Sequence, residues 1–123
     1  MEVGYERKHF TGKVVSVALR IIKLYQFISA KKKEFVLSKQ ILRSGTSIGA
    51  NIEEAGHAQS KMDFVNKLSI AQKESAETNY WLRLLRDSDY LTAKQADSVL
   101  TDCEEIQKLL TSSIKTAKAN LKK

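Results

Sequence analysis

Two Glu-x-x-His motifs come closest to a metal-binding or catalytic pattern. They lie at Glu6–His9 and Glu54–His57, and their spacing matches the ligands of di-iron helical bundles. Such a site needs both motifs on core-facing helices and one further glutamate from each of two other helices. The first motif precedes the first periodic segment, and the second ends a helix beside a glycine. We therefore expect both to be exposed, and predict no metal and no cofactor.

The remaining side chains that could act as nucleophiles or bases also favour a non-enzymatic protein. Cys103 is the single cysteine, so a cysteine zinc site and an intramolecular disulfide are both excluded. It lies on an apolar helical stripe, which is typical of a buried structural thiol. His9 and His57 are the only imidazoles, and no Ser/His/Asp arrangement follows from the spacing. We predict no catalytic residue.

Basic residues are unevenly distributed along the 123-residue chain, which has a formal net charge of +7. Residues 1–33 hold eight basic and two acidic side chains, and a smaller excess lies in the C-terminal tail. Clustered positive charge attracts phosphate backbones, although it also serves solubility alone. The candidate nucleic-acid contacts lie in the first helix and the corner after it: Lys13, Arg20, Lys23, Lys31, Lys32 and Lys33.

Four segments show helical periodicity and must position these residues. Apolar residues recur at three- and four-residue steps at about 12–30, 35–57, 60–87 and 93–121. Thr11 is a plausible N-cap for the first segment, and capping boxes begin the last two, Ser60 with Asp63 and Thr92 with Gln95. Short polar corners make consecutive helices antiparallel neighbours. The sequence predicts one domain over residues 1–123, an all-α antiparallel up-down-up-down four-helix bundle.

The second segment is rich in small residues. Gly45 and Gly49 lie four apart and so share one helical face; each costs about 1 kcal/mol of helix propensity relative to alanine, which suggests close approach of another helix. A phosphate-binding loop is excluded because no Gly-Lys-Ser/Thr follows a strand. Asn51 and Glu54 are predicted to help to set register or partner choice, and Arg43 to pair across helices with an acid such as Glu74 or Glu77.

The third segment is apolar on more than one face, because Val65, Ile70, Trp81 and Leu84 lie away from its main seam. A helix of this kind often meets a partner, although a wide stripe also serves the interior of a compact bundle. Tyr80 and Trp81 could stack on nucleic-acid bases, but an aromatic pair within a bundle helix is more often core or interface. The pattern favours self-association.

Several motifs between Phe35 and Leu85 resemble one family. They include Arg43-Ser44-Gly45-Thr46-Ser47-Ile48-Gly49-Ala50-Asn51-Ile52-Glu53-Glu54-Ala55, Ser60-Lys61-Met62-Asp63-Phe64 and Glu77-Thr78-Asn79-Tyr80-Trp81-Leu82. These stretches resemble the small four-helix bundle family also called the 23S ribosomal RNA intervening-sequence protein, or S23, family. Ala55 stands where many members have glycine, and Gly49 replaces the proline of another branch. Neither departure threatens the fold.

The resemblance implies a cytoplasmic bundle that forms a ring-like homopentamer. It also implies a likeness to the accessory variability determinant of diversity-generating retroelements, a basic pentameric bundle that works with a reverse transcriptase and nucleic acid. We expect a homo-oligomer that binds RNA or DNA; the alternative is a module that docks onto a protein partner such as a polymerase. No apolar run approaches the roughly 20 residues of a membrane span, and no signal core is present, so we expect a cytoplasmic protein without a membrane partner.

Overall fold

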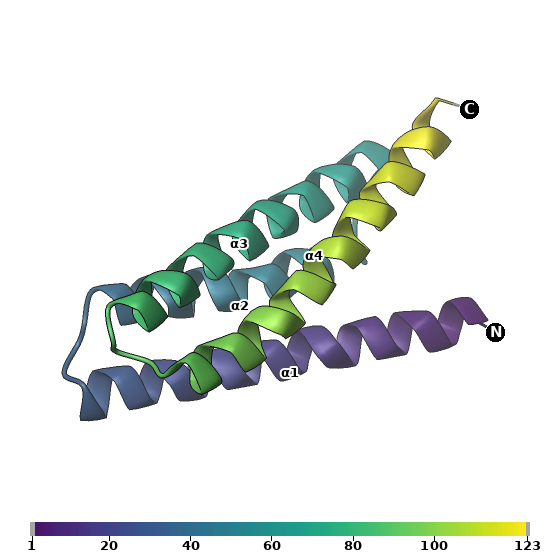
Figure 1. Ribbon diagram of the computed structural model, residues 1–123. Coiled ribbons are helices and arrows are strands. Elements are labelled where there is room, and N and C mark those ends of the chain that lie inside the picture. Colours follow the sequence, from purple (N-terminus) through teal and green to yellow (C-terminus); the bar gives the residue numbers. More distant parts are fainter. Residues whose placement is uncertain (1, 123) are drawn as a thin grey trace.

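Four long helices form the protein in the computed structural model, which describes the backbone of residues 2–122 and the side chains of residues 10–122 (Figure 1). Helix α1 spans Glu2–Lys31, α2 spans Leu37–Ala55, α3 spans Lys61–Asp87 and α4 spans Ala93–Leu121. Each helix packs on the next one in the chain, and α4 returns to α1. The predicted all-α, antiparallel bundle is confirmed.

Helix α1 begins earlier than predicted. It starts at Glu2 rather than near residue 12, and Thr11 is an exposed residue within the helix. The prediction that Thr11 caps the first helix is therefore wrong. The physical reason is that Gly4 and Gly12 weaken helix propensity by only about 1 kcal/mol each, which does not stop a helix that lacks proline.

The starts of α3 and α4 follow the sequence prediction closely. Ser60 Oγ accepts a hydrogen bond from the Asp63 N–H at 3.0 Å. Thr92 and Gln95 form a complete capping box, in which each side chain accepts from the other residue's backbone N–H. These side chains satisfy amide donors that the first helical turn leaves without a partner.

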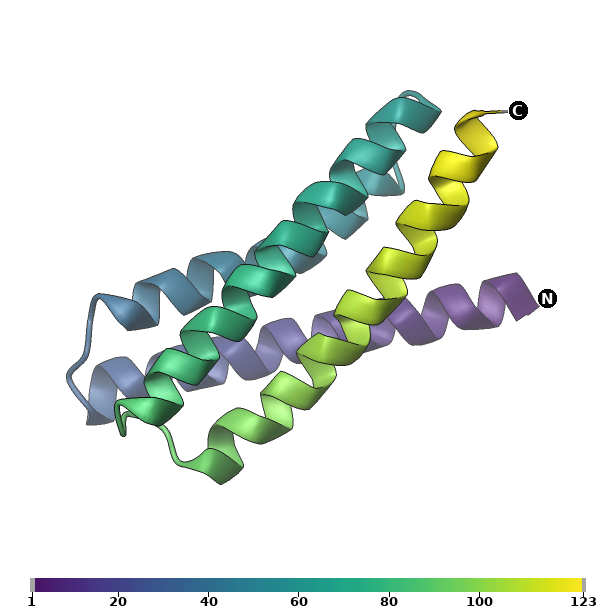
Figure 2. The ribbon, with the colours of Figure 1, turned by 45° about the horizontal axis from the view of Figure 1, so that its top comes forward.

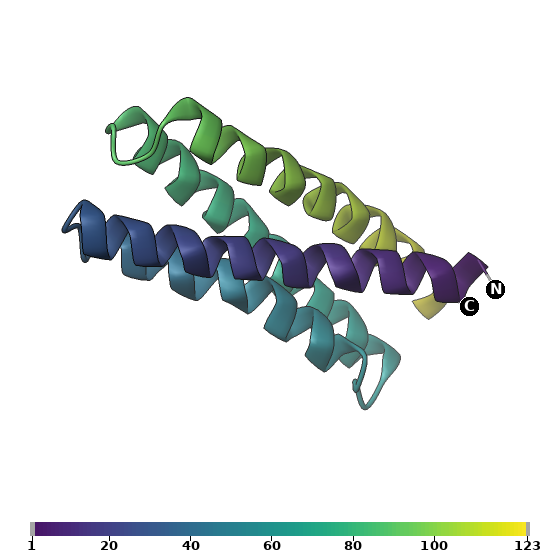
Figure 3. The ribbon, with the colours of Figure 1, turned by 90° about the horizontal axis from the view of Figure 1, so that it is seen from below.

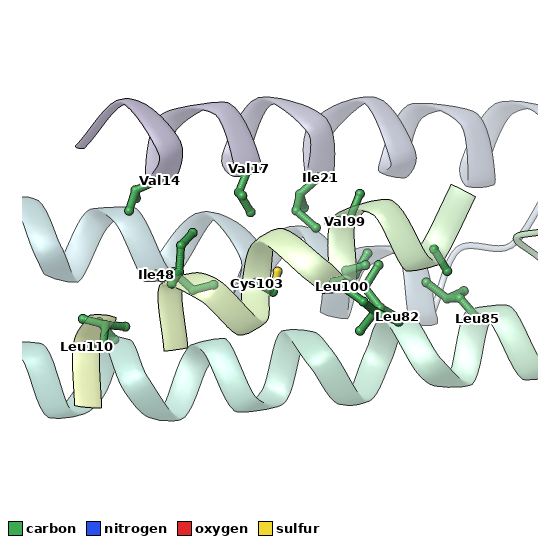
Figure 4. Close-up of a cluster of buried hydrophobic side chains, with 14 of the residues drawn as sticks. Val14, Val17, Ile21, Ile48, Leu82, Leu85, Val99, Leu100, Cys103 and Leu110 are labelled. Atoms are coloured by element: carbon green, nitrogen blue, oxygen red, sulfur yellow. The ribbon is translucent and has the colours of Figure 1, made fainter. Parts of the chain in front are cut away.

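The core runs along the centre of the bundle and receives side chains from every helix. In Figure 4, Val14, Val17 and Ile21 of α1 face the layer that contains Ile48, Cys103 and Leu82. The largest wholly buried side chains include Ile21, Ile28, Ile41, Ile48, Leu82, Leu85, Ile106 and Leu110. Burying one such side chain contributes about 1.5–3 kcal/mol, so this core accounts for much of the driving force for folding.

The two glycines of α2 lie against α1, as their spacing predicted. A Cβ added at Gly45 would lie 2.7 Å from Cγ2 of Ile21, and one added at Gly49 would lie 3.1 Å from Cγ1 of Val14. Contacts below about 3 Å are not tolerated without movement, so Gly45 allows α1 and α2 to approach each other closely. Close helix packing is therefore confirmed at this position.

Among residues 10–122, four polar side chains are buried: Ser38, Ser44, Ser75 and Thr78. Thr78 Oγ1 lies 3.0 Å from Ser44 Oγ, a hydrogen bond that links α3 to α2, and 2.8 Å from the carbonyl of Glu74 in its own helix. Within the described residues, Ser75 Oγ is the one buried side-chain polar atom that has no hydrogen-bond partner. A buried polar group without a partner costs free energy, so its presence requires an explanation.

Both chain ends lie at one end of the bundle, and the α1–α2 and α3–α4 connections lie at the other (Figures 1 and 2). The interface between α1 and α4 is the least extensive of the four, and these helices diverge toward the chain ends (Figure 1). In Figure 3, where the bundle is seen from below, α1 lies across α2. Among residues 2–122, we find no helix whose length and hydropathy would let it span a bilayer.

Candidate nucleic-acid interface

Two of the predicted nucleic-acid contacts, Lys13 and Arg20, hold α1 to α4. Lys13 Nζ lies 2.5 Å from Glu105 and 3.6 Å from Asp102, and Arg20 binds both Asp102 and Ser98. The hydrogen bond with Glu105 is the main reason why the pKa of Lys13 is raised. We call Lys13, Arg20, Asp102 and Glu105 the α1–α4 clamp. The charge of these two basic residues is largely balanced within the fold, so it is less available to a phosphate.

The other four predicted contacts remain exposed, but they do not form one strong patch. Lys23 lies on α1, while Lys31–Lys33 form the corner after it, where Lys33 adopts a left-handed backbone (φ 54°) and Lys32 lies 5.9 Å from the Phe27 ring centroid. No ion pair joins these lysines to any described residue. The acidic turn that contains Asp87 and Asp89 lies at this same end of the bundle (Figure 2), which weakens the local positive potential.

The structure adds a basic surface that the predicted contacts did not include. Residues 106–123 contain five lysines and no acidic residue. Lys108, Lys115 and Lys122 repeat every seven residues, which places them on one side of α4 at intervals of roughly 10 Å. Lys118 adjoins them, and all four are exposed without an ion pair in the described part of the chain. We call these four residues the α4 lysine row. Their spacing, together with the absence of acids, could have identified them from sequence.

Cross-helix ion pairs join α2 to α3 as predicted. Arg43 Nη1 lies 3.2 Å from Glu74 Oε2, and Arg43 also binds Glu77. Glu54 binds Lys67 of α3 at 2.7 Å. Exposed pairs of this kind contribute little stability individually.

Asn51, Tyr80 and Trp81 occupy three different environments. The Asn51 amide donates to the carbonyl of Ser47 at 2.9 Å, within its own helix. Trp81 is half-buried and donates its indole N–H to Glu77 at 2.9 Å, whereas Tyr80 is 47% exposed and meets Trp81 edge-on at 5.1 Å. The hydrogen bond to Glu77 therefore fixes the Trp81 ring against the bundle, and Tyr80 is the more exposed of the two rings.

The Glu-x-x-His motifs do not converge on a site in the described residues. His57 lies at the exposed end of α2, with Nε2 4.0 Å from Glu53, while Glu54 is engaged by Lys67. The side chains of Glu6 and His9 lie outside the described part. Among residues 10–122, no group of three potential metal ligands (His, Cys, Asp or Glu) lies close enough to hold a metal ion. Cys103 is buried, and this burial raises its thiol pKa to about 12, which makes it a poor nucleophile.

Several large apolar side chains remain exposed on the single chain. Val15 and Leu19, four residues apart on α1, are 51% and 55% exposed. Ile70 and Tyr80 are exposed on α3, whereas Val65, which the sequence placed outside the main seam, is buried. The α1 pair and the α3 pair lie on different helices.

The fold and these surfaces define an all-α bundle protein with exposed basic and apolar faces. The sequence model of the family described as 23S rRNA-intervening sequence protein matches residues 9–112. The chain therefore belongs to this family.

A solved structure supports the same assignment. It is a protein with unknown function from the S23 ribosomal protein family of Bacteroides thetaiotaomicron VPI-5482. The two proteins share 57% sequence identity, with a TM-score of 0.85 over 86% of this chain and 98% of the other. A search of curated proteins found no significant match.

Proposed function

We propose that this protein is a non-enzymatic, self-associating helical bundle that binds RNA or DNA through lysines on its surface. The observation that carries the proposal is the α4 lysine row, because its lysines are exposed and no acidic residue lies between Lys108 and Lys122 in the sequence. Lysines at regular intervals along a helix favour contact with a phosphate backbone, without a requirement for a particular base sequence.

A salt series tests the nucleic-acid part of the proposal. We expect a labelled single-stranded RNA or DNA to bind at low salt, and the double variant Lys115→Gln/Lys122→Gln to bind about tenfold more weakly. The slope of log affinity against log salt should fall by roughly 1.4, since each single-strand phosphate contact contributes about 0.7. Filter binding or fluorescence anisotropy measures both quantities.

The matched control is Lys73→Gln/Lys94→Gln, which removes two exposed lysines outside the α4 lysine row. This control lowers the net charge by the same amount, so it measures how much binding is lost through the change in overall charge alone. Absence of binding at low salt would refute the proposed function. An equal loss in both double variants would show that the row has no special role.

Self-association is supported by the exposed apolar residues on α1 and α3. We propose a homopentamer, whose mass by light scattering would be five times the 13.9 kDa of one chain. Leu19→Glu should shift the protein toward smaller species, because it places a charge on an apolar surface that the assembly would bury. Thr11→Glu, an exposed and already polar position on the same helix, is the control. A wild-type monomer at tens of micromolar would contradict this part.

A second candidate function is docking onto a protein partner such as a polymerase, without direct contact to nucleic acid. Phe35 and Val36, at the α1–α2 corner, are 53% and 69% exposed and adjoin the corner lysines. An apolar pair bordered by positive charge suits an acidic, partly apolar protein surface. Charge reversal at Lys115 and Lys122 would weaken nucleic-acid binding but spare a protein contact made through Phe35, Val36 and the corner lysines.

A further inference from the structure

A groove lies between α3 and α4, beside the α4 lysine row, with which it shares Lys108. It has a volume of about 370 Å³. Ser75, Asn79 and Arg83 line it from α3 at four-residue intervals, and so lie along one side of that helix. Cys103, Glu104, Gln107 and Lys108 line it from α4. Beyond these residues, Gln72 and Thr111 join the two helices through a 2.8 Å hydrogen bond.

The groove contains the buried hydroxyl that lacks a partner. Ser75 is 1% exposed, and its Oγ makes no hydrogen bond to any described residue. Serine within a helix often donates to the carbonyl four residues earlier, as Ser29 and Ser69 do here at 2.7 and 2.8 Å. Ser75 does not, so a donor remains unused at the inner side of a solvent-accessible groove.

The other polar groups of the groove are mostly donors as well. Asn79 Oδ1 accepts from Arg83 Nε at 2.7 Å, which fixes the guanidinium and leaves the Asn79 NH₂ free to donate. Arg83 also lies 6.0 Å from the Tyr80 ring centroid, a second restraint on its position. Arg83 and Lys108 supply two positive charges, opposed by the single carboxylate of Glu104. The groove thus presents several donors and a net positive charge.

We propose that the α3–α4 groove binds a phosphate group. Phosphate offers several acceptor oxygens and a negative charge, which match a guanidinium, an ammonium, two amides and an unused hydroxyl. Arg83 and Lys108 neutralise the charge, and Ser75, Asn79 and Gln107 orient the oxygens. The phosphate comes either from a nucleic-acid backbone or from a small phosphorylated molecule. The backbone source rests on the proposed function, and Lys108 would then connect the groove to the α4 lysine row.

The test uses inorganic phosphate and a short labelled oligonucleotide as probes. Phosphate is titrated against the full-length protein while the side-chain amide signals of Asn79 and Gln107 are followed by NMR. We expect saturable shifts in the wild type, at least a tenfold weaker phosphate affinity in Arg83→Gln, and a several-fold weaker affinity in Ser75→Ala. Lys73→Gln, an exposed lysine of α3 that does not line the groove, should bind phosphate like the wild type.

Ser75→Ala separates binding from folding. The hydroxyl has no intramolecular partner to lose and alanine favours helices, so the variant should unfold at the same or a higher temperature than the wild type while binding phosphate more weakly. A merely structural serine would give unchanged phosphate binding. The proposal is overturned if phosphate produces no saturable shift, or if Arg83→Gln and Ser75→Ala bind it as the wild type does.

The oligonucleotide distinguishes the source of the phosphate and keeps the two proposals separable. Weaker oligonucleotide binding by Arg83→Gln than by Lys73→Gln would assign the groove to a nucleic-acid backbone. Saturable phosphate binding with no oligonucleotide binding would support the groove as a small-molecule site and refute the proposed function. Oligonucleotide binding that is insensitive to both groove variants, with no phosphate shift, would refute only the groove.

Discussion

Gly45→Ala is expected to lower the free energy of unfolding by about 1–3 kcal/mol, even though alanine is the better helix former. The added methyl group would lie 2.7 and 2.9 Å from two carbons of Ile21, which is wholly buried. Isoleucine is β-branched and restricted at χ1, so it cannot rotate away easily. The helices must separate or Ile21 must leave its preferred rotamer, and either response weakens the core.

Urea unfolding followed by circular dichroism measures this change, and two other glycines provide matched controls. Gly12→Ala makes the same substitution on α1, where the added Cβ meets no described atom within 4 Å; it should raise stability by up to about 1 kcal/mol. Gly49→Ala should fall between the two, because its Cβ would lie 3.1 Å from one methyl group of Val14. If Gly45→Ala were as stable as Gly12→Ala, the inference that α1 and α2 approach each other closely at Gly45 would be contradicted.

Helices α3 and α4 were predictable because their sequences contain local start signals. Ser60 accepts a hydrogen bond from the Asp63 N–H, while the Asp63 carboxylate accepts from the Gln59 N–H instead of closing the box; Thr92 and Gln95 form the complete capping box. Helix α1 has no comparable signal at its true start, and Thr11 offered a false one. Amphipathic periodicity indicates where a helix packs, but it does not show how far the helix continues beyond its packed part.

The candidate interface was harder to predict because charge counts along a sequence ignore contacts formed by folding. Lys13 and Arg20 belong to the most basic third of the chain, yet their partner Asp102 lies far away in sequence and meets them only when α4 packs on α1. In α4 the acidic residues lie in the first half of the helix, so a net charge taken over residues 91–123 does not show that Lys108, Lys115, Lys118 and Lys122 follow one another without an intervening acid. The groove of Ser75 and Arg83 likewise depends on how two helices pack.

The start of α2 depends on a carboxylate that the sequence identified only as part of a polar corner. Glu34 accepts hydrogen bonds from the N–H groups of Leu37 at 3.0 Å, Ser38 at 2.8 Å and Val36 at 3.1 Å. Val36 occupies the N-cap position and makes no side-chain cap of its own. Glu34→Gln is therefore expected to destabilise the protein by about 1 kcal/mol at neutral pH, and Glu34→Ala by up to about 2 kcal/mol.

The effect of Glu34 should depend on pH in a defined direction. Partial burial acts to raise the pKa of this carboxyl, but the N–H donors of Leu37, Ser38 and Val36 outweigh it, so its pKa lies below the usual value. A lowered pKa in the folded state means that stabilisation is complete above the unfolded-state pKa and is lost as the pH falls through the folded-state pKa. The stability difference between wild type and Glu34→Gln should thus shrink as the pH falls from about 5 toward 3.

Urea unfolding at several pH values between 7 and 3 measures this difference directly. Glu104→Gln, which removes an exposed carboxylate from the middle of α4 rather than from a helix start, is the control for the loss of one negative charge. A difference for Glu34→Gln that stays constant down to pH 3 would contradict the role of the carboxylate charge. In that case the Glu34 side chain would act only as a neutral hydrogen-bond acceptor for the first turn of α2. This is the helix whose close packing on α1 depends on Gly45.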